Sequence, residues 1–317
     1  MSGPAPDPIT ASDPACGTIA VLGPGGVGGF LAGALARAGD DVLVVAREPT
    51  AEVIAREGVH VESLTLGDFT ARPAATARLE RPVAALLVAT KASGLEAALA
   101  RVATEPALVV PLLNGLDHVA LLRGRFGARA VVGTIRIEAD RVAPGRIVHT
   151  SRFMHVELAS DDPARGAQLD ALAARLNAAG VPTRVVAGEA QALWGKLVRL
   201  SALALATAAH DLPLGAIRAD PELRAELAGC VEEAAAVARA EGARIDAATV
   251  HGELDRVHDD FGSSMQRDVA AGREPELDAI AGAVLRAGAR HGLVCPTVAA
   301  LAARVAARAG IPVPVAA

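Results

Sequence analysis

Short apolar runs and helical patterns alternate along the first 187 residues of the chain. Four runs have the length of a buried strand, and they lie at residues 18–22, 41–46, 83–89 and 108–113. Continuous apolar runs of this kind are typical of parallel strands that are covered on both faces. Helices are predicted at residues 27–38, 94–103 and 163–179, and shorter strands at residues 59–66, 70–76 and 183–186 and within 131–158.

The pattern changes at Gly188, beyond which long Ala- and Leu-rich helical segments replace the strands. These helices are predicted at residues 189–209, 221–241, 246–261, 276–291 and 297–309. They show no fixed repeat period, which excludes a solenoid. The sequence therefore predicts an α/β protein, with an N-terminal Rossmann-type doubly wound sheet over residues 17–187 and a smaller all-α C-terminal domain over residues 188–317.

A glycine-rich turn joins the first predicted strand to the first predicted helix. Residues 23–28 read Gly-Pro-Gly-Gly-Val-Gly, which is a Gly-x-Gly-x-x-Gly pattern. The first glycine permits a tight turn, the second lets the backbone approach a pyrophosphate, and the third lets the helix lie close to the strand. Free N–H groups at the helix start would face the phosphates. The strand at 41–46 closes a βαβ unit, so we predict a dinucleotide site at Gly23, Gly25, Gly26, Val27 and Gly28.

The residue that follows the second strand indicates which dinucleotide binds. An NAD site has Asp or Glu there to hold the ribose hydroxyls, whereas this chain has Arg47. A guanidinium fits a 2′-phosphate, so the sequence predicts NADP(H). Two alternatives stay open: Arg47 is a solvated strand-end residue, or Glu48 supplies the carboxylate of an NAD site.

Composition and charge narrow the classes of partner. A net charge of −5 and 2% aromatic residues argue against a nucleic-acid partner. The hydrophobic fraction of 52% is raised by Ala, and no run reaches the roughly 18 apolar residues of a membrane helix. Cys16, Cys230 and Cys295 are far apart, without metal-like spacing or a His cluster. We expect a soluble cytoplasmic protein that has no metal and does not bind a membrane, with a disordered tail at residues 1–16 instead of a signal peptide.

Two polar residues follow buried strands at the predicted ligand edge of the sheet. Lys91 comes after the strand at 83–89, and Asn114 comes after the strand at 108–113. Ligands of a doubly wound sheet bind outside the carboxyl ends of its strands, so both residues are candidates for the cofactor crevice. The simpler interpretations are a solvated strand end for Lys91 and an Asn-Gly turn for Asn114.

Further polar candidates interrupt the helical second half. Lys196 stands in an otherwise apolar stretch, and a lysine near a buried face can deliver a proton at neutral pH. Ser264 and Asp268 are four residues apart and would share a helical face, and Glu276 follows them. The simpler interpretations are a snorkelling surface lysine, a loop or helix cap at the serine, and a helix-start charge at Glu276.

Taken in order, these motifs resemble the ketopantoate reductase (2-dehydropantoate 2-reductase) family. The resemblance covers about residues 19–307 and rests on short pieces whose order and spacing match. They are Gly-Pro-Gly-Gly-Val-Gly at 23–28, Arg47, Thr90-Lys91-Ala92, Asn114-Gly115, Leu193-Trp194-Gly195-Lys196, Ser263-Ser264-Met265 with Asp268 and Glu276, and His291-Gly292-Leu293-Val294-Cys295-Pro296-Thr297.

The resemblance implies an NADP-dependent oxidoreductase that acts on a CH-OH group. NADPH would lie in the first domain, with its nicotinamide in an interdomain cleft, and hydride would pass to the keto carbon of a small-molecule 2-oxo acid. The family substrate is 2-dehydropantoate, an intermediate of pantothenate biosynthesis. Lys196 would donate the proton to the developing alkoxide, and Glu276 would hold Lys196 or the substrate hydroxyl in place.

Four residues would bind the reactants by the same resemblance. Ser264 would bind the substrate carboxylate, and Asp268 would support Ser264. Lys91 and Asn114 would orient the carbonyl and the nicotinamide, which makes both of them substrate-binding and cofactor-binding candidates.

The chain departs from the family pattern at three positions near the lysine. Family members commonly carry asparagines one and two helical turns after it and before the glycine of the following loop, where this chain has Leu200, Ala204 and Leu214. Apolar side chains cannot hold polar groups of a substrate, so we expect a relaxed or moved substrate preference. The polar residues considered as substitutes are Arg199, Ser201, His210 and Asp211.

Two other functions fit the same motifs. One is a dehydrogenase with the same two-domain plan that oxidises a hydroxy or amino acid. The other is a protein that senses NADP(H) and has lost the chemistry. A homodimer is compatible with the Ala-Leu helices of the second domain, because such surfaces pack closely.

Overall fold

The computed structural model describes residues 17–315, which divide into two units. The first unit comprises the described residues up to Leu113 together with His118–Glu189. The second comprises Asn114–Asp117 and the residues from Ala190 onward. Segment 114–117, which the sequence places inside the first domain, thus belongs to the second unit. The predicted tail, with Cys16, lies outside the described residues.

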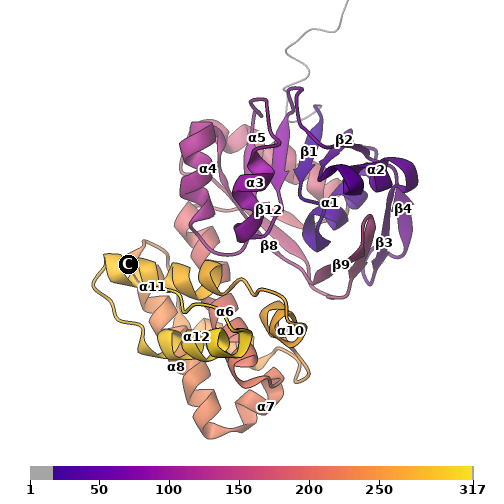
Figure 1. Cartoon of the computed structure of the whole chain (residues 1–317). Helices are drawn as coiled ribbons and strands as arrows, with labels where there is room; N and C mark the ends of the chain where they lie inside the picture. Colours follow the sequence, from indigo (N-terminus) through magenta and orange to yellow (C-terminus); the bar gives the residue numbers. More distant parts are fainter. Residues whose placement is uncertain (1–16, 316–317) are drawn as a thin grey trace, which may run out of the picture. The chain divides into compact units, whose positions relative to one another are not determined.

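Five parallel strands form the central sheet of the first unit, in the order β5-β2-β1-β6-β7. Figure 1 shows two neighbours of this sheet, β1 and β2, side by side. They are β1 (Ile19–Leu22), β2 (Val42–Val45), β5 (Ala74–Thr76), β6 (Ala85–Val88) and β7 (Val109–Pro111). Neighbours of β1 on its two sides come from different parts of the chain, which is the arrangement of a doubly wound sheet. The predicted fold class is confirmed.

Side chains of β1 alternate between two hydrophobic clusters, because successive strand residues point to opposite faces. Ile19 and Val21 pack in the cluster that contains helix α1 (Gly26–Arg37). Ala20 and Leu22 pack in the cluster that contains α3 (Leu95–Leu99) and α4 (His118–Phe126). Both faces are therefore covered, which explains why the strand sequence is apolar without alternation.

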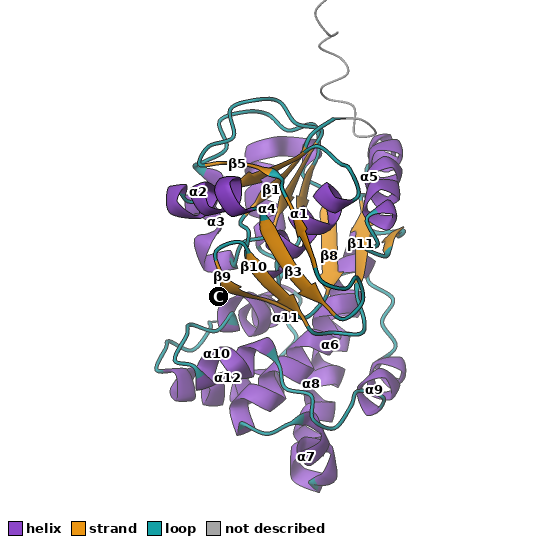
Figure 2. Cartoon of the chain, turned by 90° about the vertical axis from the view of Figure 1, so that its right-hand side faces the viewer, coloured by secondary structure: helices purple, strands orange, loops and turns teal. Residues whose placement is uncertain are grey.

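Two smaller sheets complete the first unit. One has the order β4-β3-β10-β9 and the other β12-β11-β8. Their strands are β3 (Val59–Ser63), β4 (Phe69–Ala71), β8 (Val132–Arg136), β9 (Ala139–Ala143), β10 (Arg146–His149), β11 (His155–Ala159) and β12 (Thr183–Val185). Helix α1 contacts both the central sheet and the four-stranded sheet, and Figure 2 shows β3 and β10 as a layer over it. The remaining helical elements of this unit are α2 (Glu48–Glu57), η2 (Ala92–Gly94), η3 (Gly127–Arg129), η4 (Pro163–Arg165) and α5 (Gly166–Ala178).

The strand predicted at residues 70–76 is wrong as a single element. The structure has two short strands there, β4 and β5, which belong to different sheets. Pro73 lies between them, and proline has no N–H to continue a strand ladder. The helix predicted at 94–103 also ends earlier, at Leu99.

A buried histidine links the four-stranded sheet to α1. The His149 ring lies 4.8 Å from the Phe30 ring of α1. Ser151 Oγ donates to the Phe153 carbonyl at 2.8 Å, so it accepts from His149 Nε2 at 3.1 Å. Ser63 Oγ accepts from two backbone N–H groups, so it donates to Nδ1 at 2.8 Å. The network therefore holds a neutral ring, and desolvation by burial lowers the pKa of His149 below its usual value.

Helices are the only regular secondary structure in the described part of the second unit. They are α6 (Glu189–His210), whose first residue belongs to the first unit, α7 (Leu214–Ala219), α8 (Pro221–Ala240), α9 (Ala247–Asp255), α10 (Ser264–Ala270), the π-helical turn η5 (Asp278–Gly282), α11 (Ala283–Arg290) and α12 (Pro296–Ala309). The all-α prediction is confirmed. However, the helix predicted at 246–261 ends at Asp255.

Residues 264–268 lie in helix α10, so the alternative of a helix cap is confirmed for Ser263, and Ser264 is the first helical residue. Ser263 is the N-cap of α10, and its hydroxyl accepts a hydrogen bond from the Gln266 N–H at 3.1 Å.

Cys230 and Cys295 are free and buried in this unit, and burial raises the pKa of both thiols, to about 11 for Cys295.

Helix α6 contributes many side chains to the hydrophobic core of the second unit. By length and composition alone it could cross a membrane, with a mean hydropathy of 1.3 over its most apolar window, but 72% of that window is buried inside the protein. Trp194 and Val198 of α6 pack in the core of the unit. Burial in a bundle accounts for the apolar composition of this helix.

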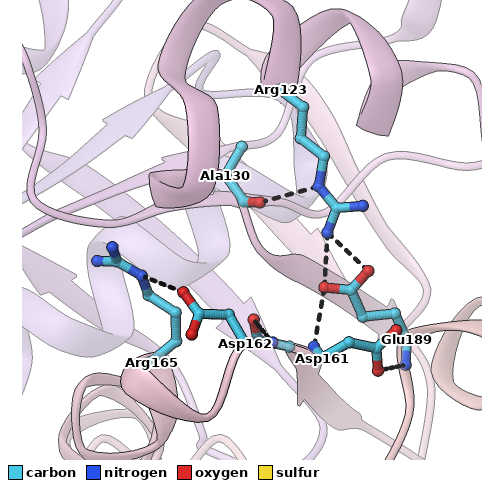
Figure 3. A network of polar contacts seen from close by, with 7 residues as sticks. Arg123, Ala130, Asp161, Asp162, Arg165 and Glu189 are labelled. Carbon is cyan, nitrogen blue, oxygen red and sulfur yellow. Dashed lines mark hydrogen bonds and ion pairs between the residues drawn. The ribbon is translucent and has the colours of Figure 1, made fainter.

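The first residue of α6 is anchored in the first unit by a charged network (Figure 3). Arg123 Nη2 donates to both carboxylate oxygens of Glu189 at 2.6 Å. Asp161 and Glu189 then exchange hydrogen bonds, each backbone N–H donating to the other's carboxylate, at 3.2 and 3.1 Å. Glu189 is only 8% exposed. A carboxylate at a helix start is also favoured by the helix dipole, so Glu189 both begins α6 and belongs to the polar network of the first unit.

Candidate active site

The glycine turn of the first unit depends on two close backbone approaches. Gly23 has φ +88°, a conformation that favours glycine. A Cβ at Gly28 would lie 2.2 Å from the Gly23 carbonyl oxygen, so any side chain there would push α1 away from the turn. Both glycines therefore have the geometry that a dinucleotide turn requires.

The start of α1 has no charge or side chain to satisfy its N–H groups within the described residues. Gly25 is the N-cap and forms no side-chain cap, and the first turn has no acidic residue. A Cβ at Gly25 would meet only the Ala89 carbonyl oxygen, at 4.0 Å, so this side of the turn is open. An open, uncapped helix N-terminus suits an anion such as a pyrophosphate.

The other two residues predicted in this turn have packing contacts. A Cβ at Gly26 would lie 1.8 Å from the Ala139 carbonyl oxygen, so glycine there allows β9 to approach α1. Val27 is half-buried and packs against the hydrophobic core of the unit. We see in these contacts a reason for the residue types that is independent of a ligand.

Three polar residues surround the turn and strand ends of this unit. Arg47 caps α2 by its position and is exposed, and within residues 17–315 its guanidinium forms no hydrogen bond or ion pair. Lys91 is exposed at the start of η2. Thr90 Oγ1 is buried without a hydrogen-bond partner in the described part of the chain, and its Cγ2 would lie 2.6 Å from a Cβ at Gly23. A buried hydroxyl without a partner beside an open helix N-terminus fits a site that a polar ligand completes.

Sequence reasoning gave Thr90 no role of its own, although it stands in the Thr90-Lys91-Ala92 motif. In the sequence, the feature that indicates a role for Thr90 is its position directly after a predicted buried strand. Strand position alone does not indicate that a hydroxyl will be buried without a partner.

The second unit brings three of the predicted residues into one hydrogen-bonded chain. Lys196 Nζ donates to Asn114 Oδ1 at 2.8 Å, and Asn114 Nδ2 donates to Glu276 Oε2 at 2.8 Å. All three side chains are half-buried. Asn114 comes from the segment after β7, Lys196 from α6, and Glu276 from the residues before η5. Residues separated by 162 positions in the sequence thus form a single site.

The chemistry of the outer residues fixes the orientation of the central amide. An ammonium group only donates hydrogen bonds and an ionised carboxylate only accepts them, so the Asn114 oxygen must face Lys196 and its nitrogen must face Glu276. The amide transmits the orientation of Glu276 to Lys196 without placing a full negative charge on the ammonium. Such a lysine is held in one direction and carries a proton that it can donate.

Two family profiles match almost the whole described chain. Residues 19–160 match the profile described as ketopantoate reductase PanE/ApbA, and residues 190–315 match that of its C-terminal part. The chain is 33% identical over 299 residues to a 2-dehydropantoate 2-reductase of Caulobacter vibrioides, covering 88% of this chain and 94% of the relative. The chain belongs to the ketopantoate reductase family. The family predicted from the sequence is confirmed.

Solved structures agree with this membership. A 2-dehydropantoate 2-reductase of Geobacter metallireducens is 29% identical with a TM-score of 0.83, over 91% of this chain and 98% of that one. A D-mandelate dehydrogenase solved with NADH and anilino(oxo)acetate has a TM-score of 0.83 at 21% identity, over 92% of this chain and 98% of that one. At that identity the likeness concerns the fold alone.

Ser264 and Asp268 lie in α10 of this ketopantoate reductase family member. Ser264 is exposed as the first residue of the helix, whereas the neighbouring Ser263 is buried and accepts a hydrogen bond from Thr207 Oγ1 at 2.7 Å. Asp268 Oδ1 accepts from Arg273 Nε at 2.7 Å. Ser264 thus has the exposed hydroxyl of the Ser-Ser pair, while Ser263 holds α10 against α6.

The three departures from the family pattern have different surroundings. Ala204 and Leu214 are buried in the hydrophobic core of the second unit, and Leu200 packs partly buried against that core. Leu200 follows Lys196 by four residues, so both lie on the same face of α6. Among the three, Leu200 therefore changes the surface next to the lysine most directly.

The four polar candidates to replace the missing asparagines have other partners. Ser201 is fully buried, and its hydroxyl donates to the Val198 carbonyl at 3.0 Å. His210 pairs with Glu226 at 2.7 Å, and Asp211 pairs with Arg308 at 2.8 Å. Arg199 Nε lies 3.9 Å from Glu253 Oε2. These groups stabilise the helical bundle.

No group of three or more His, Cys, Asp or Glu side chains within residues 17–315 is arranged to hold a metal ion.

Proposed function

We propose that the protein is an NADP-dependent oxidoreductase that reduces 2-dehydropantoate, or a related 2-oxo acid, to the 2-hydroxy acid. The observation that carries this proposal is the hydrogen-bonded chain from Lys196 through Asn114 to Glu276. Family membership supports it, because relatives named 2-dehydropantoate 2-reductase align over most of the chain. Adding a hydride to a ketone leaves a negative oxygen, and a lysine held in one direction can neutralise it.

The first unit would bind the cofactor. Gly23, Gly25 and Gly28 would hold the pyrophosphate against the start of α1, because that end is open and uncapped. The exposed guanidinium of Arg47 would bind the 2′-phosphate of NADP, for which a planar cation with several donors is well suited. Thr90 Oγ1 would gain the partner it lacks in the described residues. When bound, the nicotinamide supplies the hydride.

The second unit would supply the proton and orient the substrate. Lys196 would donate its proton to the carbonyl oxygen as charge develops there. Asn114 would keep the ammonium directed at that oxygen, and Glu276 would keep the amide directed at Lys196. The exposed Ser264 hydroxyl would bind the substrate carboxylate, with Asp268 as a further polar group. Lys91 of the first unit would be a further polar group that contacts the cofactor or the substrate. Since Leu200 shares the face of Lys196, we expect apolar 2-oxo acids to compete with 2-dehydropantoate.

Consumption of NADPH by the purified protein tests the proposal. 2-Dehydropantoate is compared with unbranched, branched and aromatic 2-oxo acids, and NADH replaces NADPH as the cofactor control. We expect NADPH-dependent reduction of at least one of these acids. Tight NADPH binding without reduction of any of them would overturn the proposed reaction and favour a sensor of nucleotide state.

A further inference from the structure

The segment Asn114–Asp117 is held to the second unit at every residue. Gly115 has φ +84°, and a Cβ there would lie 2.1 Å from the Ala279 carbonyl oxygen of η5. Leu116 packs against the hydrophobic core of the unit. Asp117 Oδ2 accepts a hydrogen bond from Arg286 Nη2 at 2.6 Å. The Asn114 amide therefore stands at the start of a segment whose following residues all contact the rest of the second unit.

Arg286 joins this segment to the turn that follows Glu276. Its Nη1 donates to Asp278 Oδ1 at 2.8 Å, and its Nη2 donates to Asp278 Oδ2 and to the Asp278 carbonyl, each at 3.2 Å. The Arg286 side chain is 23% exposed. Hydrogen bonding to Asp278 is the largest cause of a raised pKa for this guanidinium. Arg286 thus binds two carboxylates, one on the segment that carries Asn114 and one on the turn that follows Glu276.

A glycine between the two helical partners makes this arrangement possible. Asp278, Gly282 and Arg286 are spaced four residues apart, so they lie along one face. A Cβ at Gly282 would lie 2.4 Å from Asp278 Oδ1 and 2.8 Å from Arg286 Nη1. The two charged side chains therefore meet over the position where any other residue would place its side chain. The turn that contains Asp278 and Gly282 is π-helical, a local geometry that is frequent at functional sites.

We propose that Arg286, together with Asp117 and Asp278, is a positioning residue that sets the place of Asn114 between Lys196 and Glu276. Glu276 precedes Asp278 by two residues, and Asn114 precedes Asp117 by three. The Arg286 guanidinium therefore connects the two segments whose side chains form the hydrogen bond between Asn114 and Glu276. This inference rests on the proposed function, because it assigns Arg286 a role in orienting the proton donor.

The expected size of the effect follows from the geometry of the amide. Asn114 makes two hydrogen bonds of 2.8 Å in opposite directions, so a small displacement of the segment lengthens one of them. A misplacement of about 1 Å in a catalytic array can lower turnover about 100-fold. By contrast, partly exposed ion pairs contribute only about 0–1 kcal/mol to folding. Loss of the guanidinium should therefore affect turnover more than stability.

Three variants test the positioning role: Arg286→Ala, Arg286→Lys and Asp117→Asn. Arg290→Ala is the matched control, because Arg290 lies one turn further along α11 and pairs with Glu241. We expect Arg286→Ala to lower kcat about 10- to 100-fold with an unchanged Kd for NADPH. Arg286→Lys should restore part of the loss, since it retains the charge. Asp117→Asn changes a side chain that is 55% exposed, which keeps the test valid if Arg286→Ala does not fold.

A double-mutant cycle with Asn114→Ala decides whether Arg286 acts through the amide. If it does, Arg286→Ala lowers kcat little or not at all in the Asn114→Ala background. Equal losses in both backgrounds, or a loss in Arg290→Ala of the same size, would overturn the inference.

Hydrogen exchange separates this inference from the proposed function. We expect the amides of residues 115–117 to exchange faster in Arg286→Ala than in the wild-type protein and in Arg290→Ala. An unchanged exchange rate would overturn the positioning role even in an active enzyme. Faster exchange in a protein that reduces no 2-oxo acid would retain the structural link and reject the reaction.

Discussion

The two units carry candidate sites of opposite kinds. In the first unit the predicted dinucleotide turn consists of backbone groups, and Gly25 and Gly28 matter because they carry no side chain. In the second unit Lys196, Asn114 and Glu276 matter because of their terminal polar atoms, which hold one another at 2.8 Å. Substitutions that enlarge a side chain should therefore impair the glycine turn, whereas substitutions that shorten a side chain should impair the polar site of the second unit.

This difference indicates how each site is kept in place. The glycine turn is fixed by β1, which is fully buried, and by α1, which is buried from Gly28 to Leu35. The polar chain of the second unit is instead fixed by further polar contacts, such as Arg286 with Asp117 and Asp278. Substitutions should therefore separate cofactor binding from proton transfer.

The largest expected effect is that of Lys196→Ala. The proposed general acid contributes about 10²- to 10⁴-fold, so kcat should fall by that factor. Fluorescence titration should give an unchanged Kd for NADPH, because the glycine turn is intact. Lys196→Arg keeps the charge but does not release a proton, and it should be as slow. Unchanged turnover in Lys196→Ala would contradict the division of roles between the units.

A pair of glycine variants should separate folding from binding in the first unit. In Gly28→Ala the new methyl group meets the Gly23 carbonyl, and overpacking of this kind costs about 1–3 kcal/mol. Gly25→Ala adds its methyl group on the open side, so the melting temperature should stay constant while Kd for NADPH rises about tenfold or more, about 1.4 kcal/mol.

Calorimetry of Gly28→Ala and Gly25→Ala measures their melting temperatures, and nucleotide titration measures their Kd for NADPH. If Gly25→Ala binds NADPH like the wild type, the pyrophosphate does not lie at this turn.

Arg47→Ala should change the choice between the two dinucleotides. A hydrogen bond to a charged group is worth about 1.5–3 kcal/mol, so the preference for NADPH over NADH should fall about 10- to 100-fold. The ratio of kcat/KM for the two cofactors measures this. Arg56→Ala is the control, because Arg56 is exposed on the same helix and pairs with Glu57. An equal ratio in the wild type and Arg47→Ala would favour the alternative in which Glu48 binds ribose.

The smallest expected effect is a pH dependence confined to the first unit. Burial lowers the pKa of His149, so the unfolded chain binds a proton near pH 6.5 before the folded protein does. As the pH falls below that value, the free energy of unfolding should decrease until the folded pKa is passed. Denaturant unfolding at several pH values should detect this in the wild type and not in His149→Gln.

His258→Gln is the control for this prediction, since His258 is exposed. Because the His149 ring lies against Phe30 of α1, NADPH binding should weaken over the same pH range. A slope that persists in His149→Gln would assign the titration to another group.

The fold could be predicted from the sequence because its signals are local. Four continuous apolar runs correspond to four strands of the central sheet, and the loss of such runs after Gly188 corresponds to the helical unit. Short elements were less predictable. Residues 70–76 look like one strand, yet the chain passes from one sheet to another at Pro73, and this depends on partners that are distant in the sequence.

The candidate site was predictable residue by residue but not as an arrangement. Asn114, Lys196 and Glu276 could each be singled out from polar chemistry in an apolar context and from the family resemblance. Their contact depends on how segment 114–117 packs against η5, which no local pattern indicates. The Arg286 contacts could have been suspected from Asp278, Gly282 and Arg286 at intervals of four, although Asp117 lies 169 residues from its partner.

Segment 114–117 makes the second unit discontinuous in the gene. A protein fragment that began at Ala190 would contain Lys196 and Glu276 but not Asn114, whose amide lies between them. Chimaeras that exchange the helical unit between relatives at a single crossover would combine an asparagine loop from one parent with its supporting arginine from the other. Recombination, truncation and split-protein designs should therefore keep residues 114–117 together with the residues from Ala190 onward.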